Sequence, residues 1–113
     1  MKRGDVFYAN LDPTQGAETQ KTRPVLIVSN DAANRAAALV TVLPLTSNVS
    51  RIFPFEVKLL AISTGMSKDS KALAQPVRTL DKGRLAKTAS GHVSADLMTQ
   101  VDAALRLHLS LSL

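Results

Sequence analysis

The sequence predicts one mostly-β domain of the α+β class, built from about five short antiparallel strands with helices at the side and end. Three observations predict it. Short apolar runs alternate with turn sequences, and a single long segment near the C-terminus repeats apolar residues at helical spacing. The 113 residues leave room for one hydrophobic core, so we expect residues 1–113 to form a single domain.

The first two expected strands are Asp5–Leu11 and Val25–Val28, joined by a polar connection of about a dozen residues. Hairpin connections usually have two to five residues, and longer ones in compact domains are often functional. This connection contains a carboxylate, an ammonium group and a guanidinium within six positions, at Glu18, Lys21 and Arg23. We therefore look for the chemistry of the protein here.

The middle of the chain predicts a short helix and three further strands. Ser29 or Asn30 can cap a helix over residues 32–36. The expected strands are Leu39–Leu43, which Pro44 ends or places at an edge; Ile52–Leu59, with Pro54 at an edge or bulge; and Ala72–Leu80, interrupted at Pro76. Phe53 and Phe55 would share one face of their strand and fill the core, whereas one of the adjacent Phe7 and Tyr8 must point outward.

The C-terminal segment predicts a helix from Ala95 to about Leu109. Ser94 can cap it, and Arg106 and His108 lie near its negative end. His108 falls on the apolar stripe and is expected to be packed or at an interface. The alternating leucines from Leu105 to Leu113 have the period of a strand. We therefore assign no secondary structure to the residues after Leu109.

Composition limits the function. The net charge of +5 and isoelectric point near 10 favour polyanions or an acidic partner, although a basic solvated surface is the alternative. The absence of cysteine excludes disulfides and thiolate chemistry and fits a reducing cytosol. No apolar run approaches the ~18 residues that cross a bilayer, and the N-terminus lacks the pattern of a signal peptide.

Arg23 is the leading site candidate from the residues themselves. Because Arg23 precedes Pro24, it should be extended where the connection re-enters the sheet, with a planar donor fork suited to phosphate oxygens. The alternative is an ion pair with Glu18 or Asp12 at the surface. Thr46 and Ser47 follow a strand, where turn-forming hydroxyls are the commoner case. No metal-ligand spacing or phosphate-binding glycine loop occurs, so we predict no metal and no cofactor.

A collinear set of motifs gives the chain a family resemblance. From residue 3 to about residue 109 it contains Arg3-Gly4-Asp5-Val6, Asp12-Pro13-Thr14-x-Gly16-x-Glu18, Thr22–Val28, Pro44-Leu45-Thr46-Ser47, Phe53–Val57, Lys68-Asp69-Ser70 and Val77–Leu85. In order and spacing these motifs resemble the PemK/MazF toxins of bacterial toxin–antitoxin pairs. The resemblance implies an SH3-like antiparallel barrel of the PemK/MazF/CcdB type, working as a cytoplasmic homodimer that an acidic, MazE-like antitoxin inhibits.

The resemblance also implies sequence-specific, metal-independent cleavage of single-stranded RNA. The ribose 2′-hydroxyl would attack the adjacent phosphate and leave a 2′,3′-cyclic phosphate and a 5′-hydroxyl. Arg23 matches the catalytic arginine, Thr46 the supporting hydroxyl and Glu18 a loop carboxylate that could be the general base. The remaining candidate RNA contacts are Lys21, Thr22, Ser47, Asn48, Arg51, Gln75 and Arg78, and the loop over residues 63–71 would complete the groove walls.

One position departs from the family pattern. Where several members have an acid before Gln-Pro, this chain has Ala74 before Gln75 and Pro76. Gln75 can position a group but cannot accept a proton, so the chain either uses another base or relies mainly on electrostatics. Two other functions remain as alternatives: a non-catalytic toxin of the same fold that inhibits a protein such as DNA gyrase, and a basic nucleic-acid-binding module.

Overall fold

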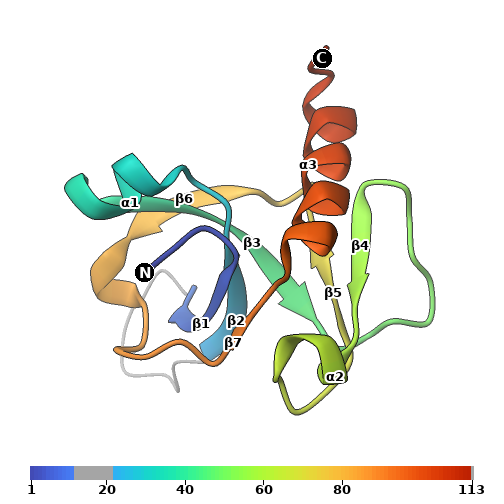
Figure 1. Cartoon of the computed structure of the whole chain (residues 1–113), viewed down its shortest axis with the longest axis horizontal. Coiled ribbons are helices and arrows are strands. Elements are labelled where there is room, and N and C mark those ends of the chain that lie inside the picture. Colours follow the sequence, from blue (N-terminus) through green and yellow to red (C-terminus); the bar gives the residue numbers. More distant parts are fainter. Residues whose placement is uncertain (12–21, 113) are drawn as a thin grey trace.

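The computed structural model describes residues 1–11 and 22–112 (Figure 1). Its elements are β1 (Asp5–Asn10), β2 (Thr22–Ile27), α1 (Asp31–Ala36), β3 (Leu39–Thr46), β4 (Glu56–Leu59), α2 (Ala61–Thr64), β5 (Ser70–Leu73), β6 (Arg78–Asp81), the short 3-10 helix η1 (Lys82–Arg84), β7 (Gly91–His92) and α3 (Ala95–Leu109). The predicted class is confirmed: an antiparallel, mostly-β fold with a short helix after the second strand and a helix at the C-terminal end.

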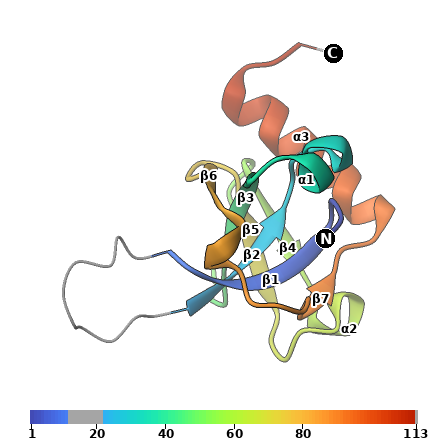
Figure 2. The same ribbon diagram turned by 90° about the vertical axis from the view of Figure 1, so that its left-hand side faces the viewer.

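The strands of the described residues form one strongly bent sheet in the order β4-β5-β3-β2-β1-β7, with β6 also paired to β3. The long strand β3 divides its length between two partners on one side. Residues Leu39–Val42 pair with β6, whereas Leu45 and Thr46 pair with β5. This change of partner makes the sheet curl into the half-barrel that Figures 1 and 2 show from two sides.

Of the two predicted roles for Pro44, ending the strand or marking an edge, the first is wrong, because β3 continues through Pro44 to Thr46. Pro44 lies inside β3, opposite Val25 of β2, in the two-residue interval between the segments paired with β6 and with β5. Proline has no N–H to donate to a ladder. The strand can therefore continue through Pro44 because the residue falls where one partner has ended and the next has not begun.

Alternating residues on the central strands supply two apolar clusters. One face, with Val6, Leu26 and Leu43, packs against the α3 residues Met98, Val101 and Ala104. The other face, with Phe7, Val25, Ile27, Val40 and Val42, packs with Leu80 of β6. One of the two adjacent aromatic residues points outward, as predicted: Phe7 is buried and Tyr8 is exposed. The central strands thus have an apolar residue on both faces, which explains their nearly continuous apolar sequence.

The predicted strand Ile52–Leu59 is only half correct. β4 begins at Glu56, and the preceding residues form a turn in which the Glu56 N–H donates to the Phe53 carbonyl. The rings of Phe53 and Phe55 stack in parallel with centroids 5.5 Å apart. Phe55 packs on the core, but Phe53 covers its outer side and is 40% exposed, so the core prediction was wrong for Phe53. The cause is the turn, because strand alternation does not apply there.

The two predicted helices, α1 and α3, begin and end close to the residues that the sequence indicates, whereas α2 and η1 were not predicted. Asn30 caps α1 and Ser94 caps α3, each by accepting a backbone N–H. The predicted helix from Ala95 to about Leu109 is confirmed, and Ser110 in a left-handed conformation stops it. The His108 ring lies 6.5 Å from that of Phe55, so this histidine is packed as expected. Within the described ranges, no helix combines the length and apolar character needed to cross a membrane.

Candidate functional site

A pocket of about 350 Å³ opens where β2 starts and where β3 and β5 meet. Two cations, four hydroxyls and four largely apolar side chains line it: Arg23 and Lys68; Thr46, Ser47, Ser67 and Ser70; and Tyr8, Pro24, Leu45 and Met66. Arg23 and Thr46, which are 23 positions apart in the sequence, therefore share one pocket. The two residues that the sequence analysis paired therefore lie in the same pocket of the fold.

Strand topology brings these side chains together. β2 and β3 are antiparallel, with Val25 opposite Pro44, so the start of β2 lies beside the end of β3, where Arg23 and Thr46 are each two residues further on. Arg23 itself is fixed in the sheet by pairing with Ala9 of β1. On the other side of β3, Thr46 is opposite Lys71, which places Ser70 next to the same corner. Three neighbouring strands thus contribute the polar end of the pocket.

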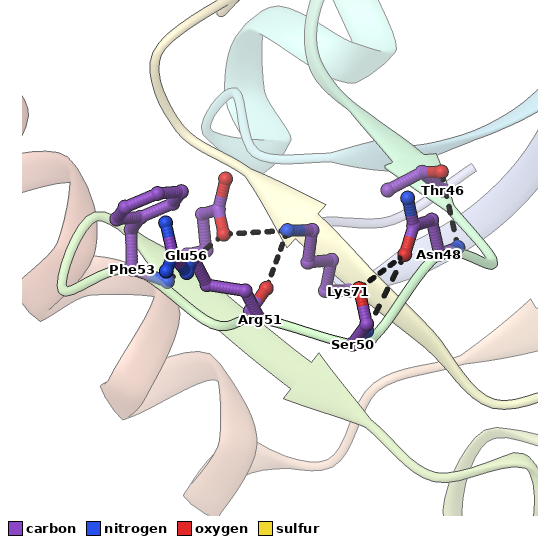
Figure 3. Close-up of polar contacts among 7 residues, drawn as sticks. All are labelled: Thr46, Asn48, Ser50, Arg51, Phe53, Glu56 and Lys71. Atoms are coloured by element: carbon purple, nitrogen blue, oxygen red, sulfur yellow. Dashed lines mark hydrogen bonds and ion pairs between the residues drawn. The ribbon is translucent and has the colours of Figure 1, made fainter.

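Thr46 has a defined orientation. Its Oγ1 accepts a hydrogen bond of 3.2 Å from the backbone N–H of Asn48. The Asn48 side chain in turn accepts from the N–H and hydroxyl of Ser50, which closes a compact turn after β3 (Figure 3). A hydroxyl that accepts one bond still has its own hydrogen to donate. Thr46 is therefore a positioned donor at the pocket edge.

A nearly buried ion pair holds the rest of the β3–β4 loop (Figure 3). Lys71 Nζ donates to Glu56 Oε1 at 2.8 Å and to the Arg51 carbonyl at 2.7 Å, and Glu56 accepts the Phe53 N–H at 3.0 Å. Burial of Glu56 acts to raise the pKa of its carboxyl, but the bonds from Lys71 and Phe53 outweigh it and hold that pKa below the ordinary value. The loop is thereby tied to β5.

The wall opposite Arg23 comes from the segment between α2 and β5. The Asp69 side chain accepts the Ala61 N–H at 2.8 Å, and the Thr64 hydroxyl accepts the Met66 N–H at 3.2 Å. β7 packs closely behind it, since a methyl group at Gly91 would lie 2.7 Å from the Thr64 carbonyl oxygen and 3.0 Å from Met66 Sδ. Figure 2 shows α2 beside β7. These contacts fix the position of the Met66–Ser70 wall.

The structure does not bring every predicted RNA contact into the pocket. Thr22, Asn48, Arg51, Gln75 and Arg78 are all exposed outside its lining. The Arg51 guanidinium lies 5.5 Å from the centre of the Phe53 ring, and Arg78 Nη1 donates to the Leu11 carbonyl at 3.3 Å. Glu18 and Lys21 fall outside the described residues. Of the candidate residues that the structure describes, Arg23, Thr46 and Ser47 line the pocket. The others remain predicted RNA contacts outside the pocket.

The pocket also contains residues that the sequence reasoning did not name as site residues. Tyr8, Met66, Ser67, Lys68 and Ser70 all line it. The sequence did carry a signal, because Lys68-Asp69-Ser70 is among the matching motifs and the loop over residues 63–71 was expected at the groove. What the sequence lacked was the pairing of β5 with β3, which carries this segment to Thr46.

Cationic groups and hydroxyl donors are groups that bind phosphate oxygens, so the lining of this pocket is chemically suited to a phosphate-bearing ligand. In residues 1–11 and 22–112, no three His, Cys, Asp or Glu side chains gather in a way that could hold a metal ion. The fold and the site together are those of a small basic β protein with a polar pocket between strand ends.

The comparisons with known proteins name the family. Residues 2–109 match the model of the PemK-like, MazF-like toxin of type II toxin–antitoxin systems, and the chain belongs to this family. Endoribonuclease MazF9 of Mycobacterium tuberculosis is 42% identical over 98% of both chains, and endoribonuclease EndoA of Bacillus subtilis is 37% identical over 98% of this chain and 96% of its own. A mycobacterial endoribonuclease in complex with its cognate antitoxin superposes with a TM-score of 0.75 at 28% identity, covering 100% of this chain and 96% of that one.

Proposed function

We propose that this protein is an endoribonuclease toxin that cleaves single-stranded RNA at a short sequence without a metal ion. Its family membership and its endoribonuclease relatives supply the class of activity. The observation that carries the proposal to particular residues is the single pocket shared by Arg23 and Thr46. Single-stranded RNA is the form whose base edges protein side chains can reach.

The chemistry follows from the groups in the pocket. Attack by a ribose 2′-hydroxyl on the neighbouring phosphorus builds negative charge on the phosphate oxygens and on the departing 5′-oxygen. Arg23 presents a guanidinium that is charged at any working pH to those oxygens, and Thr46 donates its hydroxyl hydrogen to one of them. The departing 5′-oxygen takes a proton from the Arg23 guanidinium, which recovers one from water, or from water directly, and the products are a 2′,3′-cyclic phosphate and a 5′-hydroxyl. Glu18 is the carboxylate that we assign as the base for the 2′-hydroxyl proton.

The residues outside the pocket fit an extended substrate. The exposed basic side chains of Arg51 and Arg78 could follow the phosphates on either side of the cut, while Asn48 and Gln75 offer amides for base edges. Such contacts would add affinity that depends on salt, since each neutralised phosphate releases counterions. RNA of several nucleotides is therefore the proposed ligand, with the pocket receiving the part around the scissile phosphate.

An acidic antitoxin and a second copy of the chain are the proposed partners. The net charge of +5 favours an acidic protein as the inhibitor, and one structural relative is an endoribonuclease in complex with its cognate antitoxin. We infer that the toxin is a homodimer acting in the cytoplasm, where mRNA and antitoxin are both present. Light scattering on the purified chain measures directly whether it is a homodimer.

The decisive experiment is to incubate purified protein with a long RNA in EDTA and map the new ends. We expect cleavage at a recurring short sequence with 5′-hydroxyl and cyclic phosphate ends. Arg23→Ala should keep the fold, as seen by circular dichroism, and lose cleavage and growth arrest. A single 2′-deoxy sugar at the cut site should stop turnover while leaving binding largely intact.

Three results would contradict the proposal. A folded Arg23→Ala protein that cleaves at the wild-type rate would remove Arg23 from the site. Wild-type protein that binds RNA in EDTA but releases no products would favour the nucleic-acid-binding module, whereas growth arrest without RNA cleavage would favour a protein target.

A further inference from the structure

Ser70 has an unusual hydroxyl. In the part of the chain that the structure describes, Ser70 Oγ is a buried polar atom without a hydrogen-bond partner, and the residue is only 5% exposed. Buried hydroxyls are normally bonded, because leaving one unpaired costs free energy. The neighbouring residues show that hydrogen bonds are otherwise made here, since Asp69 and Lys71 both have partners. An unpaired hydroxyl at this position therefore needs a reason.

Its place in the fold supplies the reason. Ser70 is the first residue of β5 and lines the pocket that also holds Arg23 and Thr46. Leu45 and Met66 line the same pocket, so Ser70 combines a polar atom with apolar surroundings. A nucleobase has this chemistry, because its faces are apolar and its edge carries donors and acceptors. A phosphate would instead favour the charged side of the pocket, at Arg23 and Lys68.

We propose that the Ser70 side chain, which no hydrogen bond from the described residues holds, rotates its hydroxyl into the pocket when RNA binds and there reads the edge of one base next to the scissile phosphate. Ser70 is thus a specificity-determining residue. This inference rests on the proposed nuclease function. The bound base completes the hydrogen bonding of Ser70, while Arg23 and Thr46 hold the phosphate. Recognition of this kind is selective, since a base with the wrong edge leaves the hydroxyl unpaired again.

The test compares Ser70→Ala with the wild type on one long RNA, with all cut sites mapped by sequencing. The variant should cut the best wild-type sequence about three- to ten-fold more slowly, which corresponds to the loss of one hydrogen bond. Base preference should weaken at a single position beside the cut. Its melting temperature should equal or exceed that of the wild type, because the substitution removes an unpaired buried hydroxyl. Ser90→Ala, at an exposed serine outside the pocket lining, is the matched control and should change neither property.

An abasic nucleotide at the affected position separates the base from the sugar. It should slow the wild type at least as much as Ser70→Ala does, because it also removes the apolar contacts of the base, and adding Ser70→Ala to the abasic substrate should slow cleavage little further. An unchanged base preference in Ser70→Ala, additive losses or a clear fall in its melting temperature would each overturn the inference. Wild-type protein that does not cleave RNA would instead end the proposed function, and this inference with it.

Discussion

Lys71 Nζ lies 2.8 Å from Glu56 Oε1, and only 11% and 10% of the two side chains are exposed. Each partner also binds one backbone group of the β3–β4 loop, the Arg51 carbonyl and the Phe53 N–H. The Lys71–Glu56 pair is thus the link between the sheet and the loop that follows Thr46. Thr46 and Lys71 are opposite each other in neighbouring strands, and Thr46 lines the pocket. A substitution in the Lys71–Glu56 pair is therefore expected to affect the position of Thr46.

Lys71→Met should destabilise the protein by about 3 kcal/mol, because it leaves the Glu56 carboxylate nearly buried without its cation. Urea unfolding followed by circular dichroism measures this as a lower midpoint with an unchanged slope. Lys58→Met, on the neighbouring strand β4, removes an exposed lysine and should change stability by less than about 0.5 kcal/mol.

The Glu56→Gln/Lys71→Met double variant checks the cause. The glutamine carbonyl can still accept the Phe53 N–H, and no charge stays buried, so the double variant should recover much of the stability that Lys71→Met loses. Equal stability of the single and double variants would show that packing of the lysine stem, and not its charge, is what matters at this position.

Acid should destabilise the wild type partly through Glu56. Its pKa is lower in the folded protein than in the unfolded chain, so its stabilising contribution is complete above about pH 4.5, the ordinary value, and is lost as the pH falls through the folded pKa. Asp31, whose pKa is lowered mainly by the Arg3 N–H, acts in the same direction. Glu56→Gln keeps Asp31, so its free energy of unfolding should fall less steeply than that of the wild type between pH 5 and about pH 3. Identical slopes would contradict the assignment.

The fold was largely predictable because its strands and helix ends carry local signals. β-branched runs, the caps at Asn30 and Ser94 and the break at Pro76 each depend on neighbours in the sequence. The two errors have a common physical origin. Pro44 continues a strand because of where its partners stop, and Phe53 is exposed because of a turn, and neither is visible in residue order.

The site was predictable only in part for a similar reason. Arg23, Thr46 and Ser47 carry motif signals, and the structure places them in one pocket. Ser70 and Met66 belong to that pocket through the pairing of β5 with β3 and the close packing of Gly91, which no periodicity reveals. The charged loop that contains Glu18 lies outside the described residues, so the assignment of the base stays a prediction.

Thr46→Val tests the hydroxyl with almost no change of shape. We expect single-turnover cleavage to slow by about 100-fold, because one donor to the developing charge is lost. The Asn48 N–H also loses its acceptor, which should lower stability by about 1 kcal/mol. Thr46→Ser keeps the hydroxyl and should retain most of the activity. If Thr46→Ser and Thr46→Val were equally slow, the methyl group and not the hydroxyl would be the important part of the side chain.

Gly91→Ala tests whether β7 positions the pocket wall. The added methyl group would lie 2.7 Å from the Thr64 carbonyl oxygen and 3.0 Å from Met66 Sδ, so the Thr64–Met66 segment must move. We expect a loss of about 1–3 kcal/mol in stability, as for overpacked cores, together with slower cleavage and an altered base preference, since Met66 lines the pocket. Gly83→Ala is the control, because its methyl group would meet only the Asp81 side chain, away from the pocket lining, and its cleavage pattern should match the wild type. A destabilised Gly91→Ala protein with an unchanged cleavage pattern would show that the wall tolerates displacement and that β7 has no influence on base choice.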